Sequence, residues 1–171
     1  MPIKNHLVLC AALAWAGAAG AAGMSSDHDF AVQAARDGAT EISLGHVAEQ
    51  NGQSQAVKDF GRRMVRDHGQ AGEKLKAAAR QDGIELPEQA PPKASDAHEL
   101  GKLKGAEFDR AYAQQAVKDH EKAVALFQRE AREGSKPHVK AFAEETLPIL
   151  EEHLRMAREL DGHSGNHEAG H

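Results

Sequence analysis

Four polar side chains of metal-binding type fall near the middle of four helix-like segments of this chain. They are Glu41, His68, His120 and His153. Each lies on the apolar stripe of its segment, where buried residues recur at spacings of three and four. Helices of similar length that pack side by side share one middle level, so we expect these side chains to meet inside a four-helix bundle. Three neutral imidazoles and a carboxylate suit one transition-metal ion such as iron, zinc, manganese or copper.

A buried polar group without a partner costs about 1–3 kcal/mol, and a lone carboxylate costs more. The cluster must therefore bind an ion or form a metal-free network with water. The first case predicts a periplasmic metal-binding or metal-responsive protein. The second predicts a non-catalytic stress- or envelope-associated bundle whose polar core only sets the packing. An enzyme that uses His68 as a general base is a third hypothesis, and it requires an open cleft.

Three acidic residues directly precede the three histidines. They are Asp67, Asp119 and Glu152. A shift of one residue turns a side chain by about 100° around a helix. We therefore expect these carboxylates to be hydrogen-bond partners of the imidazoles or surface residues, rather than direct ligands.

The remaining histidines lie in the C-terminal tail or off the stripes. The tail over residues 163–171 is rich in Gly and His, which predicts disorder. Its His163, His167 and His171 form a weak candidate site for zinc, copper or nickel, and a solvated terminus is the alternative. Four others are predicted to be surface residues: His28, His46, His98 and His138.

The elements that position these residues are all helical. Stripes and caps predict long helices over about 27–50, 55–82, 106–134 and 136–162, with a short helix over 97–104. Ser26 or Asp27 is the expected N-cap of the first helix, and Gly83 the expected stop of the second. Pro137 suits the first turn of the last helix, and Pro148 should kink it.

The connections between the helices predict the topology. The first and last links are short, which favours two antiparallel hairpins. The Pro-rich stretch 83–94 can cross the bundle, so the second and third long helices are expected to run parallel, as in ferritin-like folds. A faint internal echo pairs 57–60 (VKDF) with 139–142 (VKAF), which would fit a duplicated hairpin.

The helices form a single domain, predicted over residues 24–162, and further segments precede and follow it. Residues 1–23 are typical of a secretory signal peptide, with Lys4 before a short apolar run and small residues near 21–23. Export predicts a periplasmic or secreted protein, and an uncleaved N-terminus would be the route to membrane association. Cys10 is the only cysteine, so no disulfide partner is expected.

Composition excludes several classes of function. The net charge is −5, and the chain shows no basic patch with interleaved aromatic residues, so nucleic acid is not an expected partner. No nucleophile motif, glycine-rich phosphate loop or Cys-x-x-Cys-His occurs. Hydrolase, thiol-redox and c-type haem functions therefore have no support in the sequence.

Several short motifs recur together in a known bacterial family. They are Phe30-x3-Ala34, Glu41-x2-Leu44-Gly45-x2-Ala48, Val57-Lys58-x-Phe60-x3-Met64-Val65-x-Asp67-His68, Leu86-Pro87, Phe108-Asp109-x2-Tyr112, His120, Leu147-Pro148 and His153-Leu154. Over about residues 29–160 the chain resembles the family called domain of unknown function 4142. The resemblance implies an exported, ferritin-like helical bundle and no established activity.

The sequence departs from ferritin-like proteins that hold two metal ions. Those proteins use Glu-x-x-His motifs, whereas Val65 stands three residues before His68 and Leu150 three residues before His153. The missing carboxylates argue against ferroxidase or oxygenase chemistry. A mononuclear metal, or none, fits the sequence better.

Overall fold

The chain folds into four long helices and one short one. The computed structural model describes residues 19–87 and 94–165, and no strand occurs in these ranges. The helices are α1 (Ala19–Asn51), α2 (Gln55–Gln81), α3 (Ala94–Gly101), α4 (Gly105–Glu133) and α5 (Pro137–Gly165). The predicted all-α class is confirmed.

Helix ends follow local chemistry. The Ser54 side chain accepts a hydrogen bond from the Val57 backbone N–H and caps α2. Gly83 adopts a positive φ of 69° just after α2, a conformation that glycine takes without steric cost. Pro137 is the first residue of α5, where its missing N–H is not needed.

The predicted start of the first helix is wrong. Helix α1 begins at Ala19 and runs through Ser26 and Asp27, so neither residue is its N-cap. The Asp27 carboxylate instead accepts hydrogen bonds from the Ser135 backbone N–H, at 2.9 Å, and from the Ser135 hydroxyl. Asp27 thus stabilises the turn between α4 and α5, and its carboxylate accepts a backbone N–H there instead of one in its own helix.

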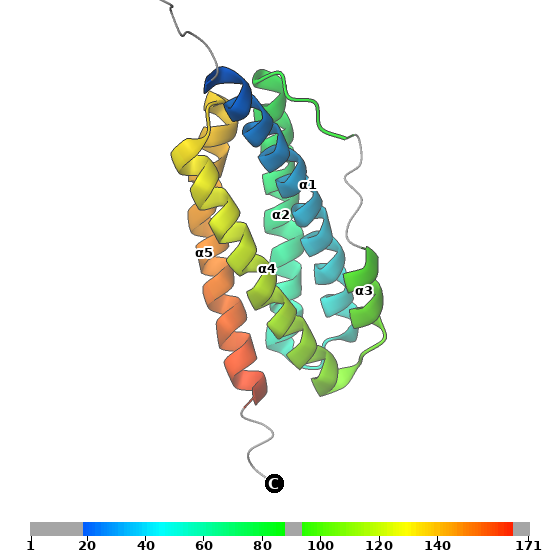
Figure 1. Cartoon of the computed structure of the whole chain (residues 1–171). Coiled ribbons are helices and arrows are strands. Elements are labelled where there is room, and N and C mark those ends of the chain that lie inside the picture. The colour runs from blue at the N-terminus through cyan, green and yellow to red at the C-terminus, as the bar shows by residue number, and fades with distance from the viewer. Residues whose placement is uncertain (1–18, 88–93, 166–171) are drawn as a thin grey trace, which may run out of the picture.

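The long helices form two antiparallel hairpins, α1 with α2 and α4 with α5 (Figure 1). Helices α2 and α4 run parallel, so the end of α2 and the start of α4 lie at opposite ends of the bundle, and α3 lies near the start of α4 (Figure 1). This is the long crossover that the Pro-rich connection predicts. Helix α3 packs on α1.

Two apolar clusters fill the core, one toward each end. The first includes Phe30, Leu75, Phe127, Phe142 and Leu150. The second includes Leu44, Phe60, Met64, Phe108 and Tyr112. Along each of three helices a histidine separates the two clusters, since His68 lies between Met64 and Leu75 and the other two occupy matching places. The three histidines therefore lie at the boundary between the two apolar clusters.

Small residues bring α1 and α2 close together. A Cβ atom at Gly45 would lie 2.7 Å from the Gly61 carbonyl oxygen, and one at Gly61 would lie 2.8 Å from the Ala48 Cβ. Such separations are below van der Waals contact, so neither position accepts a side chain without moving the backbone. Glycine at these two positions therefore allows the close packing of α1 and α2.

One large apolar side chain of α5 faces solvent. Ile149 is 42% exposed, whereas its neighbour Leu150 is buried. None of the helices in the described ranges is long and apolar enough to cross a membrane.

Candidate metal centre

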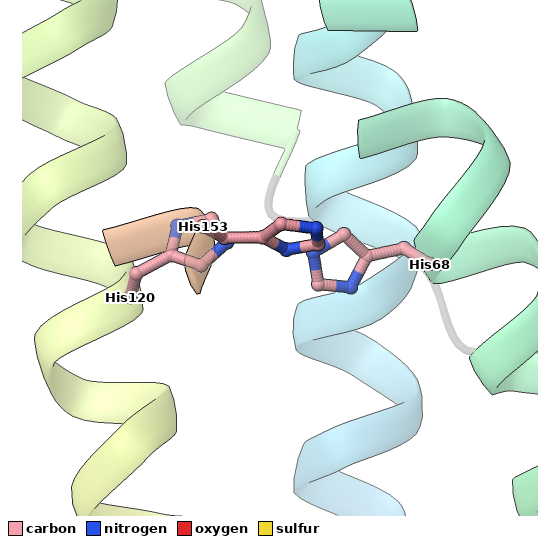
Figure 2. A group of neighbouring side chains, drawn as sticks. All are labelled: His68, His120 and His153. Atoms are coloured by element: carbon pink, nitrogen blue, oxygen red, sulfur yellow. The ribbon is translucent and has the colours of Figure 1, made fainter. Parts of the chain in front are cut away.

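The imidazoles of His68, His120 and His153 meet in the interior of the bundle. They come from α2, α4 and α5, and their side chains point toward one another (Figure 2). The ring centroids lie 5.4–5.6 Å apart. The three residues are only 9%, 1% and 1% exposed. Three polar rings thus share one buried site.

Hydrogen bonds fix the orientation of two of the rings. The His120 Nδ1–H donates to the Ala116 carbonyl oxygen at 2.9 Å, since a carbonyl can only accept. The His153 Nε2–H donates to the Asp67 carboxylate at 3.0 Å. The guanidinium groups of Arg63 and Arg66 hold Asp67 in turn, at 3.2 and 2.9 Å. A carboxylate that orients a ligand imidazole is a common outer contact of metal sites.

One nitrogen of each ring is buried without a hydrogen-bond partner in the described part of the chain. These atoms are His68 Nε2, His120 Nε2 and His153 Nδ1. Because the opposite nitrogens of His120 and His153 carry the donated protons, His120 Nε2 and His153 Nδ1 present lone pairs in the neutral rings. Each such atom costs about 1–3 kcal/mol if nothing binds it.

The three imidazoles are held in the neutral form that binds metals. Burial, together with the nearby His120 and His153, lowers the pKa of His68 to about 3. Burial lowers the pKa of His120 to about 4, against the opposing effect of its bond to Ala116. The pKa of His153 is also lowered by burial, although Asp67 acts in the other direction. At neutral pH, no proton competes with a metal here.

The spacing suits a metal after a small inward movement. One ligand atom from each of the three residues lies within 4.8 Å of the others. Bonds of 2.0–2.1 Å to one ion at tetrahedral angles would place the nitrogens about 3.3 Å apart. Each ring would then move by about 1 Å or less, which a small rotation of the side chain supplies.

Glu41 lies on α1, separate from this close group. It is buried and lines the same cavity as His68 and His120. Its carboxylate is not among the atoms that lie within 4.8 Å of one another. Burial, followed by the charges of Glu41 and Glu49, raises the pKa of Tyr112 well above its usual value. The Glu41 carboxylate is therefore close enough to Tyr112 to affect its hydroxyl group electrostatically.

The three acidic neighbours take different roles. Asp67 contacts His153 of α5 rather than the adjacent His68. Asp119 accepts a hydrogen bond from Gln115 at 2.6 Å and lines the cavity. Glu152 pairs with Arg155 on the surface. Of these three residues, only Asp67 is therefore hydrogen-bonded to one of the buried imidazoles.

The other predicted histidines divide into two groups. His28, His46, His98 and His138 are exposed, as expected. His138 pairs with Asp82 at 2.7 Å beside the first turn of α5. The side chain of His163, and residues His167 and His171, lie outside what the structure describes, as does most of the predicted signal peptide.

A cavity of about 490 Å³ adjoins the imidazoles. His68, His120 and Glu41 line one part of it, and apolar side chains line much of the rest, including Leu75, Leu126, Phe127, Phe142 and Leu150. Volumes of this order hold small organic ligands in other proteins.

Two features of the fold were missed from the sequence. The Asp109 carboxylate accepts the backbone N–H groups of Gln53 and Ser54, both at 2.8 Å, and ties the α1–α2 turn to α4. Glu130 is buried beside Asp27, and burial followed by Asp27 raises the pKa of Glu130 to about 7. One sequence pattern could have indicated the two aspartates, because Asp27 and Asp109 each stand three residues before a buried aromatic residue.

Comparisons with known proteins agree with this architecture. The family model for the domain of unknown function DUF4142 matches residues 12–160. A predicted secreted DUF305 protein from Streptomyces coelicolor superposes with a TM-score of 0.70 at 13% identity, over 82% of this chain and 92% of that one. A DUF305 fragment from Deinococcus radiodurans gives a TM-score of 0.69 at 14% identity, over 81% and 96%. No curated protein matches the sequence significantly. The chain belongs to the DUF4142 family.

Proposed function

We propose that this member of the DUF4142 family binds one transition-metal ion inside its bundle through His68, His120 and His153. The observation that carries the proposal is the set of three buried, converging ring nitrogens that have no hydrogen-bond partner in the described chain. A structural polar core would be expected to satisfy its own members. Here the hydrogen bonds of His120 and His153 leave the inward nitrogens as lone pairs.

The donor set narrows the choice of metal. Three imidazole nitrogens suit zinc or copper better than manganese, which prefers oxygen ligands. Three protein ligands also leave at least one coordination position open, as in catalytic rather than purely structural zinc sites. Glu41, buried on the wall of the same cavity, is a candidate for a further oxygen ligand.

An exported location is part of the proposal. It rests on the signal-like N-terminal sequence and on likeness to a predicted secreted DUF305 protein. In the periplasm or outside the cell, such a protein would meet metal ions directly, so binding or sensing of the ion is the function that we propose. The metal-free stress- or envelope-associated bundle is the competing outcome.

Metal analysis of the full chain separates the two. The tail histidines His163, His167 and His171 are first changed to Ala, so that they cannot contribute an ion. We expect about one zinc or copper ion per chain, retained in His46→Ala, a matched change at an exposed histidine, and lost in His120→Ala. If neither the parent nor His46→Ala binds an ion, or if His120→Ala keeps it, the proposal is wrong.

A second variant tests Glu41. In Glu41→Gln, a ligand role predicts at least a tenfold loss of metal affinity, on the order of what loss of a metal ligand or its close partner costs. Unchanged affinity would assign the site to the three histidines alone.

A further inference from the structure

The two helical hairpins of this protein repeat at an interval of 82 residues. Asp27 and Asp109 stand 82 apart, and each caps the turn of the opposite hairpin. The buried pairs Phe30 and Tyr112, Val57 and Val139, and Phe60 and Phe142 keep the same interval. The echo in the sequence therefore corresponds to equivalent positions in the bundle.

The three histidines break this repeat. At the equivalent positions, 82 residues away, Gly38 corresponds to His120, Ala71 to His153 and Leu150 to His68. All three of these residues line the cavity of about 490 Å³. At two of the three places an imidazole is replaced by a hydrogen atom or a methyl group. Part of the cavity is thus the space that a second set of rings would have filled.

The cavity opens directly onto the histidine cluster. A Cβ atom built on Gly38 would meet only His68 Nδ1, at 4.0 Å, so no side chain separates α1 from that ring. His68 and His120 belong to the wall, whereas His153 does not. An ion held by the three rings would therefore have its open position on the cavity side.

The walls define what could occupy this space. Glu41 lines this cavity together with His68 and His120, and apolar side chains such as Leu75, Leu126, Phe127 and Leu150 line much of the rest. We infer that the cavity binds a small neutral molecule with one donor atom, which coordinates the ion, and an apolar or aromatic body, which fills the space beside Gly38 and Ala71. This inference rests on the proposed metal site and names the class of ligand that the site takes.

Cobalt-loaded full chain, with the three tail histidines changed to Ala, provides the test. Titration with imidazole and with 4-phenylimidazole is followed by the visible absorption of cobalt. Both probes should change the spectrum with saturation, and 4-phenylimidazole should bind about tenfold more tightly because its phenyl ring leaves water for an apolar wall. Metal content is measured after each titration, so that loss of cobalt is not mistaken for binding.

Variants that fill the cavity supply the control. Ala71→Leu and Ala123→Leu both place a larger side chain in the cavity wall, from α2 and from α4. Each should keep cobalt and weaken 4-phenylimidazole binding by about tenfold or more, because the added volume competes with the ligand. Ala77→Leu, the same change at an exposed position of α2, should bind the probe as the parent does.

The outcomes distinguish failure of the ligand site from failure of the metal site. If cobalt binds but neither probe changes its spectrum, or if both cavity variants bind 4-phenylimidazole as tightly as Ala77→Leu, the ligand site is refuted and the metal site stands. If the parent chain binds no cobalt, zinc or copper, the metal site itself is refuted and the ligand site falls with it. Circular dichroism checks that each variant is folded, and agreement of two cavity variants guards against misfolding of one.

Discussion

Replacement of His120 by leucine should stabilise the metal-free protein. The change removes the hydrogen bond from Nδ1 to the Ala116 carbonyl, a loss of about 1 kcal/mol. That carbonyl keeps its helical partner four residues on, so it is not left unsatisfied. The change also removes the buried, unpartnered Nε2, a gain of about 1–3 kcal/mol. Leucine adds apolar contact with Phe60, whose ring lies 6.4 Å from that of His120. The net expectation is stabilisation by about 1–2 kcal/mol.

Urea unfolding at pH 7.5 measures this difference, first with a chelator and then with zinc in excess. With the chelator, His120→Leu should have the larger free energy of unfolding. With zinc at a hundred times its dissociation constant, the parent gains about 2.7 kcal/mol and the variant gains nothing, so the order reverses. A parent that is more stable than His120→Leu under both conditions would refute the reasoning, since it would mean that the imidazole is a satisfied structural group.

Three further predictions follow from the titrating groups. Metal-free protein should lose on the order of 2–4 kcal/mol of stability between pH 7 and pH 5, because the pKa values of His68 and His120 are about 3 and about 4 in the folded state and near 6.5 in the unfolded state. His120→Leu should lose less stability over the same pH range in urea unfolding, and an equal loss would contradict the assignment. Asp67→Asn should lower metal affinity by roughly 10–100-fold in competition titrations, because it weakens the bond that orients His153, and unchanged affinity would remove Asp67 from the site. Glu130→Gln should stabilise the protein by on the order of 2 kcal/mol at pH 8 and by little at pH 4.5. The pKa of Glu130 is raised to about 7 in the folded state, so its ionisation at higher pH opposes folding. A stability gain that does not depend on pH would contradict this.

The helices were predictable because their signals are local. Ser54, Gly83 and Pro137 act within one turn of the chain, and each occupies the place that its chemistry predicts. Asp27 shows the limit, because its carboxylate satisfies backbone groups of Ser135 across the bundle. A capping residue in a sequence shows that a helix end is near in space, and it does not say which helix.

The meeting of His68, His120 and His153 could be predicted from their shared level in the helices. The position of Glu41 could not, because its direction depends on how α1 rotates against its neighbours, and small residues such as Gly45 set that rotation. The partner of Asp67 was hidden for the same reason, as it is found on α5 and not on its own helix. The one sequence signal for the cavity is the 82-residue repeat, in which Gly38 and Ala71 stand at the positions equivalent to His120 and His153.

A crystal structure of the zinc- or copper-loaded full chain, with anomalous diffraction data at the metal edge, tests the central claim most directly. We expect one interior peak about 2.0–2.1 Å from a nitrogen of each of His68, His120 and His153. An interior without a peak, while the three rings keep their metal-free positions, would contradict the account.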